Sequence, residues 1–119
     1  MANVKHFGFA GTATGLTIYC LIGREKDGAT LDRTDMTFKI ASALPDNPLT
    51  EATAAGVATQ VYTFTDSTVA WDDGWYTVVV YLQAGAGAAW NTDNILATAT
   101  LFVYHDEITE RPYSFTSEV

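Results

Sequence analysis

Hydrophobic residues alternate with polar or small ones along most of this chain, and no stretch repeats them at a helical spacing. The clearest case is residues 75–83, where one side carries Tyr76, Val78, Val80 and Leu82. Successive side chains of a strand point to opposite faces of a sheet, so this pattern is typical of strands with one buried face. We therefore expect an all-β fold.

The same alternation, interrupted by turn-forming residues, predicts about seven short antiparallel strands. Residues 15–23 carry bulk on both faces, which favours a central strand, whereas residues 4–10 are typical of an edge strand. Residues 50–55 fit either a short strand or one helical turn in the connection between sheets. The remaining strands are expected at residues 34–41, 57–65, 75–83 and 95–104. Short strands at this spacing predict a β-sandwich or a barrel.

The length of 119 residues fits one domain with one core. We expect the β-sandwich to occupy residues 1–104 and a C-terminal tail to occupy residues 105–119, where the alternation stops and Pro112 occurs. A tail of this composition is expected to be ordered only against a partner. Its aromatic residues Tyr113 and Phe115 are therefore candidate partner-binding residues.

The net charge is −8, and five of the six basic residues lie before Ile40. No Lys or Arg occurs between Ile40 and Glu110. A groove that binds phosphates needs clustered basic side chains, so we expect no nucleic-acid partner. Anionic membrane surfaces are disfavoured for the same reason, and no run approaches the roughly eighteen apolar residues that span a bilayer.

Cys20 is the one cysteine in the chain, which predicts a fold without an internal disulfide. Its place in the middle of an apolar strand indicates a small core residue rather than a nucleophile. The residues that follow Met1 include no apolar run behind a charged region, so we expect no signal peptide and synthesis in a reducing cytoplasm.

The most specific local signal is DDGWYTV at residues 72–78, which resembles the corner between strands E and F of immunoglobulin domains. The resemblance implies a structural corner made by Asp72, Gly74 and Tyr76, in which the Tyr76 hydroxyl bonds back to the main chain. The segment LTIYC at residues 16–20 resembles strand B of the same family, with Cys20 in the place of its first cysteine. Together they imply an immunoglobulin-like antiparallel β-sandwich of about seven strands without the disulfide.

Three phrases, GLTIY (15–19), WDDGWY (71–76) and VYLQAG (80–85), resemble small immunoglobulin-like proteins of tailed bacteriophage virions. The similarity covers roughly residues 5 to 104 in order. It implies a structural protein located in the virion, either a capsid decoration or cement protein or a small tail or fibre module. The implied partners are the major capsid protein, a tail protein or further copies of this chain.

No combination of residues predicts an enzyme, and we expect no cofactor and no metal ion. Asp72 and Asp73 are adjacent on a turn, so they cannot face each other across a substrate as paired acids of glycosidases do. His6 and His105 lie near opposite ends of the sequence, and the run His105-Asp106-Glu107 lacks the ligand spacing of a metal site.

The candidate partner-binding residues of the sandwich itself are Trp90, Trp75 and Tyr81. Trp90 lies in a loop at residues 84–94 rich in Gly and Ala, where it is either folded back over the sandwich or presented to a partner. Trp75, Val79 and Tyr81 share the outward face of their strand, and large exposed apolar patches usually mark interaction sites. The alternative function is a carbohydrate- or receptor-binding module, in which Trp90 and acids of the loop hold a cell-surface glycan or receptor.

Overall fold

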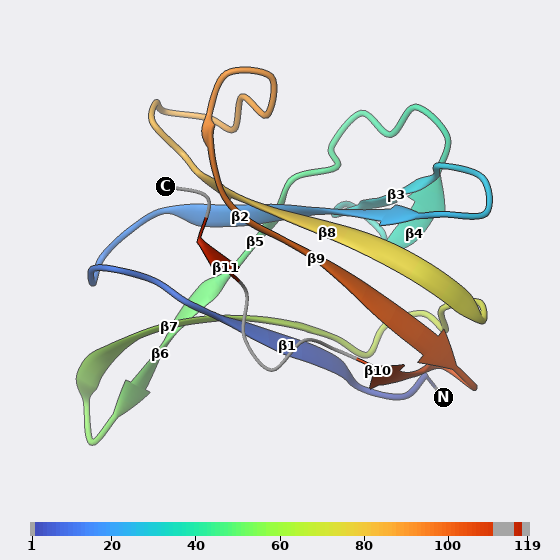
Figure 1. Cartoon of the computed structure of the whole chain (residues 1–119), viewed down its shortest axis with the longest axis horizontal. Coiled ribbons are helices and arrows are strands. Elements are labelled where there is room, and N and C mark those ends of the chain that lie inside the picture. Colours follow the sequence, from blue (N-terminus) through green and yellow to red (C-terminus); the bar gives the residue numbers. More distant parts are fainter. Residues whose placement is uncertain (1, 111–115, 118–119) are drawn as a thin grey trace.

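The computed structural model describes residues 2–110 and 116–117, and these residues form β-strands, turns and connections without a helix. Two antiparallel sheets face each other as the layers of a sandwich, one above the other in Figure 1. The expected all-β class is therefore confirmed. The strands are β1 (Lys5–Ala10), β2 (Ile18–Arg24), β3 (Thr30–Asp32), β4 (Thr37–Lys39), β5 (Asn47–Pro48), β6 (Thr50–Ala54), β7 (Val57–Asp66), β8 (Gly74–Leu82), β9 (Asn94–Tyr104), β10 (Glu107–Glu110) and β11 (Thr116–Ser117).

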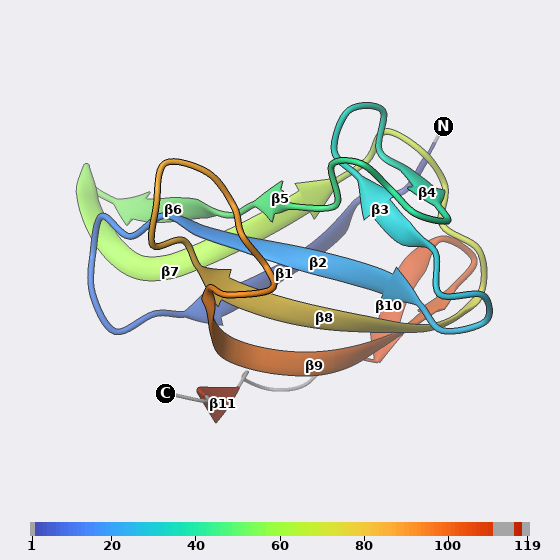
Figure 2. The ribbon, with the colours of Figure 1, turned by 90° about the horizontal axis from the view of Figure 1, so that it is seen from above.

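The smaller sheet has the order β1-β7-β6, and the larger one runs β10-β9-β8-β2-β3-β4, with β5 paired to β2 and β11 to β9. Constant-type immunoglobulin domains have strands A, B, E and D in one sheet and C, F and G in the other. Here β1, β7 and β6 take the places of B, E and D, while β2, β8 and β9 take those of C, F and G. The larger sheet curls at one edge, where β10 comes to lie beside β1 (Figures 1 and 2).

This order corrects one expectation from the sequence. The segment that contains Cys20 is not in the strand B position, because strands B and F belong to opposite sheets of an immunoglobulin domain. In this chain Cys20 lies directly opposite Val80 of β8, within the same sheet. The strand therefore corresponds to strand C, and β1 takes the place of strand B.

The core lies between the two sheets and follows the alternation in the sequence. On β1, Phe7 and Phe9 are buried and their neighbours are exposed. Cys20 is a free thiol buried in the core, as expected. The other large core side chains are Ile18, Ile22, Leu31, Leu49, Tyr62, Phe64, Trp71, Tyr76, Val78, Val80, Leu101, Val103 and Ile108.

The strand expected at residues 34–41 is the clearest local error. The structure has β3 before this segment and only the short β4 within it. Met36 and Ala41 have positive φ angles of 59° and 55°, and such angles end an extended run. Asp32 promotes the turn, because its carboxylate accepts hydrogen bonds from the Thr34 main-chain N–H and hydroxyl. Of the two alternatives for residues 50–55, the strand is the one observed.

The larger sheet continues beyond Tyr104, where the sequence predicted that the sandwich ends. A two-residue turn at His105 and Asp106, with φ angles of 49° and 60°, leads into β10, which pairs with β9. Two successive positive φ angles are the signature of a type I′ hairpin turn. The candidate residues Tyr113 and Phe115 lie outside the described residues, so the expectation for that part of the tail stays a prediction.

Candidate functional site

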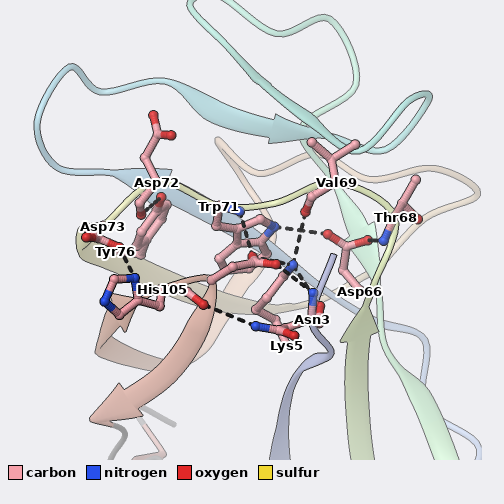
Figure 3. A network of polar contacts seen from close by, with 11 residues as sticks. Asn3, Lys5, Asp66, Thr68, Val69, Trp71, Asp72, Asp73, Tyr76 and His105 are labelled. Carbon is pink, nitrogen blue, oxygen red and sulfur yellow. Dashed lines mark hydrogen bonds and ion pairs between the residues drawn. The ribbon is translucent and has the colours of Figure 1, made fainter. Parts of the chain in front are cut away.

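The corner predicted from the sequence forms as expected. The Tyr76 hydroxyl donates a hydrogen bond of 2.6 Å to the main-chain carbonyl of Asp72 (Figure 3), and Gly74 has a φ angle of 139° that favours glycine. Burial raises the pKa of Tyr76 to about 12. The corner thus fixes the start of β8 against the core, and its role is structural.

The two adjacent acids of the corner point to different partners. The Asp72 carboxylate accepts a hydrogen bond of 2.9 Å from Lys26 and one of 3.2 Å from Arg24, and the Lys26 bond contributes most to lowering its pKa. The Asp73 carboxylate instead accepts a bond of 2.8 Å from the main-chain N–H of His105. Asp73 therefore ties the corner to the turn between β9 and β10.

Beside this corner lies a buried polar network that sequence reasoning missed (Figure 3). Its centre is Lys5, whose side chain projects inward from β1 and is 0% exposed. The Lys5 ammonium donates to Asp106 Oδ1 at 2.6 Å, to the Asn3 carbonyl at 2.9 Å and to the Val69 carbonyl at 3.0 Å. It also lies 5.6 Å from the ring centroid of Trp71.

The Asp106 carboxylate is held by donors from three segments of the chain. Besides Lys5, the main-chain N–H of Trp71 donates to Oδ1 at 2.7 Å and that of Asn3 donates to Oδ2 at 2.7 Å. Burial acts to raise the pKa of Asp106, but the hydrogen bonds from Lys5, Trp71 and Asn3 outweigh it and leave the pKa below its usual value. The network therefore joins the start of β1, the connection before β8 and the turn after β9.

Asp66 completes this network from β7. It lies opposite Lys5 in the pairing of β1 with β7, and it is buried. Its Oδ2 accepts a hydrogen bond of 3.0 Å from the Trp71 indole N–H, and its Oδ1 accepts one of 2.9 Å from the Thr68 main-chain N–H. Asp66 thus orients the indole that covers Lys5. The sequence did contain a signal for this network: Lys5 and Asp66 occupy inward positions of strands whose other inward residues are apolar.

The loop at residues 84–94 is folded onto the outer face of the larger sheet. Asp93 organises it, because its carboxylate accepts hydrogen bonds from the Tyr19 hydroxyl at 2.7 Å, the Ala89 N–H at 2.9 Å and the Ala84 N–H at 3.2 Å. The Ala89 bond contributes most to lowering the pKa of Asp93, while burial raises that of Tyr19. Tyr81 stacks on Tyr19 with ring centroids 5.1 Å apart.

The three sandwich residues expected to bind a partner differ in exposure. Tyr81 is only 8% exposed, so its ring supports the loop and offers little contact area in the isolated chain. Trp90 is 39% exposed, which places it between the two alternatives of a buried and a presented side chain. Trp75 is 44% exposed and points outward as the alternation predicts.

Trp75 is part of a larger exposed apolar surface, which we call the aromatic strip and define as Trp75, Phe102 and Tyr104. Trp75 and Phe102 are directly opposite each other on β8 and β9, with ring centroids 4.9 Å apart in an edge-to-face arrangement. Tyr104 is two residues further along the same face of β9 and is 51% exposed. Phe102 and Tyr104 were missed from the sequence, although they alternate with the buried Leu101 and Val103.

A cavity of about 490 Å³ opens between the sheets on the side of β5 and β6. Phe64 and Met36 provide apolar walls, and Arg33 lies at the cavity with an ion pair of 3.3 Å to Asp46. The other lining residues are Asn47, Pro48, Thr50, Thr63 and Thr65. The Asn47 side chain is engaged internally, since it donates to the carbonyls of Leu31 and Pro45.

Over residues 2–110 and 116–117, no group of three or more His, Cys, Asp or Glu side chains is arranged to hold a metal ion. No helix long and apolar enough to cross a membrane occurs in that same part of the chain. Comparison with models of known protein families, with curated proteins and with solved structures finds no match to this chain.

Proposed function

We propose that this chain is a non-enzymatic structural protein of a tailed-bacteriophage virion. It binds the major capsid protein as a decoration or cement protein, or a tail protein as a small tail or fibre module. The virion assignment is supported by the resemblance of residues 15–19, 71–76 and 80–85 to small immunoglobulin-like virion proteins. Its partner is a coat or tail protein or a further copy of the chain.

The observation that carries the binding role is the aromatic strip. An aromatic ring pair on the outer face of a sheet, next to the half-exposed Tyr104, is apolar area that a protein partner can bury. A buried Trp removes about 150–250 Å² from water, so the exposed 44% of Trp75 corresponds to roughly 70–110 Å². At about 25 cal/mol per Å², covering Trp75 alone contributes about 2–3 kcal/mol to binding.

The alternative, a carbohydrate- or receptor-binding module, depended on Trp90 and on loop acids, and Asp93 is the acid of the loop at residues 84–94. Asp93 is engaged with Tyr19 and with main-chain N–H groups of its own loop. A glycan would have to displace these hydrogen bonds, which is unfavourable for groups that are already satisfied. The protein-binding role is therefore the better supported of the two.

The test is affinity purification of the tagged full chain from an extract of its natural source, with mass spectrometry of the proteins that bind it. We expect the wild type to recover a capsid or tail protein in near-stoichiometric amount. Trp75→Ala should bind that protein with at least tenfold lower affinity, because about 2 kcal/mol corresponds to more than one order of magnitude in affinity. Val57→Ala is the matched control, since Val57 is exposed at the start of β7 in the opposite sheet.

Three outcomes would contradict the proposal. Recovery of no virion protein by the wild type argues against the virion role. Equal recovery by Trp75→Ala and Val57→Ala removes the aromatic strip as the binding surface. Saturable binding to a glycan or cell surface, lost in Trp90→Ala, supports the alternative module instead.

A further inference from the structure

The geometry points to a covalent bond in this chain. We propose that Lys5 and Asp106 condense to an intramolecular amide, an isopeptide bond that joins β1 to the turn between β9 and β10. The observation behind it is the approach of Lys5 Nζ to Asp106 Oδ1 at 2.6 Å, where the lysine is fully buried and the Asp106 side chain is only 13% exposed. This inference does not depend on the proposed virion function.

Lys5 has the surroundings that a nucleophilic amine needs. Its side chain is fully buried, so the protein shields the amine from water. Apart from Asp106, its hydrogen-bond partners in the described residues are the neutral carbonyls of Asn3 and Val69. The indole of Trp71, held by Asp66, covers the amine.

Asp106 is surrounded by hydrogen-bond donors that favour its carboxylate and that would also stabilise the charge formed when an amine attacks it. Attack at its Cγ places negative charge on an oxygen, and hydrogen-bond donors already aimed at that oxygen stabilise the charge. Trp71 N–H donates to Oδ1 and Asn3 N–H donates to Oδ2, each at 2.7 Å. His105 and Asp106 both have positive φ angles, and the bond from His105 N–H to Asp73 holds this turn.

The reaction balances with the groups present. A proton moves from the Lys5 ammonium to the Asp106 carboxylate along their hydrogen bond, which gives an amine and a carboxylic acid. The Lys5 nitrogen then attacks Cγ of Asp106, a C–N bond forms, and one C–O bond breaks. The departing hydroxyl leaves as water with a proton from the nitrogen, so no oxidant, cofactor or second substrate is required. Reacting groups held in one orientation behave as if at very high concentration, which replaces the activation that free amines and acids lack.

The bond would also remove two charges from the interior. A buried ion pair has a desolvation cost that its mutual attraction only partly offsets, whereas an amide is neutral. The link would connect residue 5 to residue 106 and so enclose nearly the whole sandwich. A cross-link that closes so long a loop restricts the unfolded chain strongly.

The test is the intact mass of the purified, denatured wild-type chain, followed by tandem mass spectrometry of a proteolytic digest. We expect a mass lower than that of the sequence by one water molecule, and a branched peptide that joins Lys5 to Asp106. Lys5→Arg and Asp106→Ala should have their full sequence masses. Asp106→Asn should lose ammonia instead of water and give a product identical to that of the wild type.

Lys26 and Asp72 provide the internal control, because they are also an amine and a carboxylate in contact, at 2.9 Å, but lie exposed at the surface. Their peptides should be recovered unlinked from the same digest. A folded wild-type chain with its full sequence mass, whose peptides containing Lys5 and Asp106 are separate, would overturn the proposal. This wild-type measurement decides the question even if the variants do not fold.

Discussion

Removal of one hydroxyl at the corner before β8 tests whether this local motif stabilises the sandwich. Tyr76→Phe keeps the ring, so it leaves no cavity, and it removes only the 2.6 Å hydrogen bond to the Asp72 carbonyl. Loss of a bond to a group that then lacks its partner costs about 1–3 kcal/mol. Since Asp72 is exposed and water can reach its carbonyl, we expect the lower part of this range, about 1–1.5 kcal/mol.

Urea unfolding followed by tryptophan fluorescence measures this change directly. With a urea dependence of about 1–3 kcal/mol per M for a domain of this size, the midpoint should fall by roughly 0.3–1.5 M while the slope stays constant. Tyr104→Phe is the control, because that side chain is half exposed and water satisfies its hydroxyl in both the folded and the unfolded state. If Tyr76→Phe and Tyr104→Phe unfold at the same urea concentration, the corner hydrogen bond does not contribute to stability and the argument is wrong.

Three more predictions concern the core, alkaline pH and the loop at residues 84–94. Gly11→Ala would place its Cβ 2.7 Å from Cε1 of the buried Tyr62, so we expect a loss of about 1–3 kcal/mol in urea unfolding, and a wild-type midpoint would contradict this contact. The pKa of Tyr76 is raised from 10.0 to about 12 on folding, so its contribution to stability is complete below pH 10 and is lost as pH rises through about 12. Urea midpoints between pH 8 and 12 should therefore fall more steeply for the wild type than for Tyr76→Phe, and parallel curves would exclude this linkage. Asp93→Ala removes the acceptor of the Tyr19 hydroxyl and of two loop N–H groups, so limited proteolysis near Trp90 should become faster, whereas unchanged cleavage would mean that Asp93 does not hold the loop.

Local sequence patterns were sufficient to predict those features that depend on neighbouring residues. The alternation of β8 predicts its buried side, and Tyr76, Val78 and Val80 are indeed fully buried. The corner could also be predicted, because Gly74, Tyr76 and the Asp72 carbonyl that accepts the Tyr76 hydrogen bond lie within a few residues of one another. Such interactions form wherever the local chain adopts the right conformation.

Pairing between distant strands was harder to predict. The alternation at residues 15–23 indicated a central strand but did not indicate in which sheet it lies. The same two-sided pattern fits strand B or strand C, and only the pairing of β2 with β8 decides between them. Likewise, period-two alternation at residues 34–41 did not reveal that Met36 and Ala41 adopt positive φ angles.

For the candidate sites too, the sequence predicted local orientation but not contacts between distant segments. Trp75 was predicted to point outward from its own strand, but the aromatic strip requires Phe102 from β9 to lie opposite it. Tyr81 shares the outward face with Trp75, yet the loop at residues 84–94 covers it. The exposure of a side chain on the outer face of a sheet therefore depends on which segments fold over that face. The alternation within a single strand does not predict those segments.

The sequence by itself determined the all-β class, the core-facing side of β8, the corner at Tyr76 and the burial of Cys20. These features follow from side-chain alternation and from short-range hydrogen bonds. The tertiary structure alone decided that Lys5 meets Asp106, residues separated by almost the whole chain. Their contact depends on the curl of the larger sheet, which brings β10 beside β1, and on main-chain donors from two further segments. A long-range encounter of this kind is a property of the assembled sandwich, because no local pattern encodes the distance between two remote side chains.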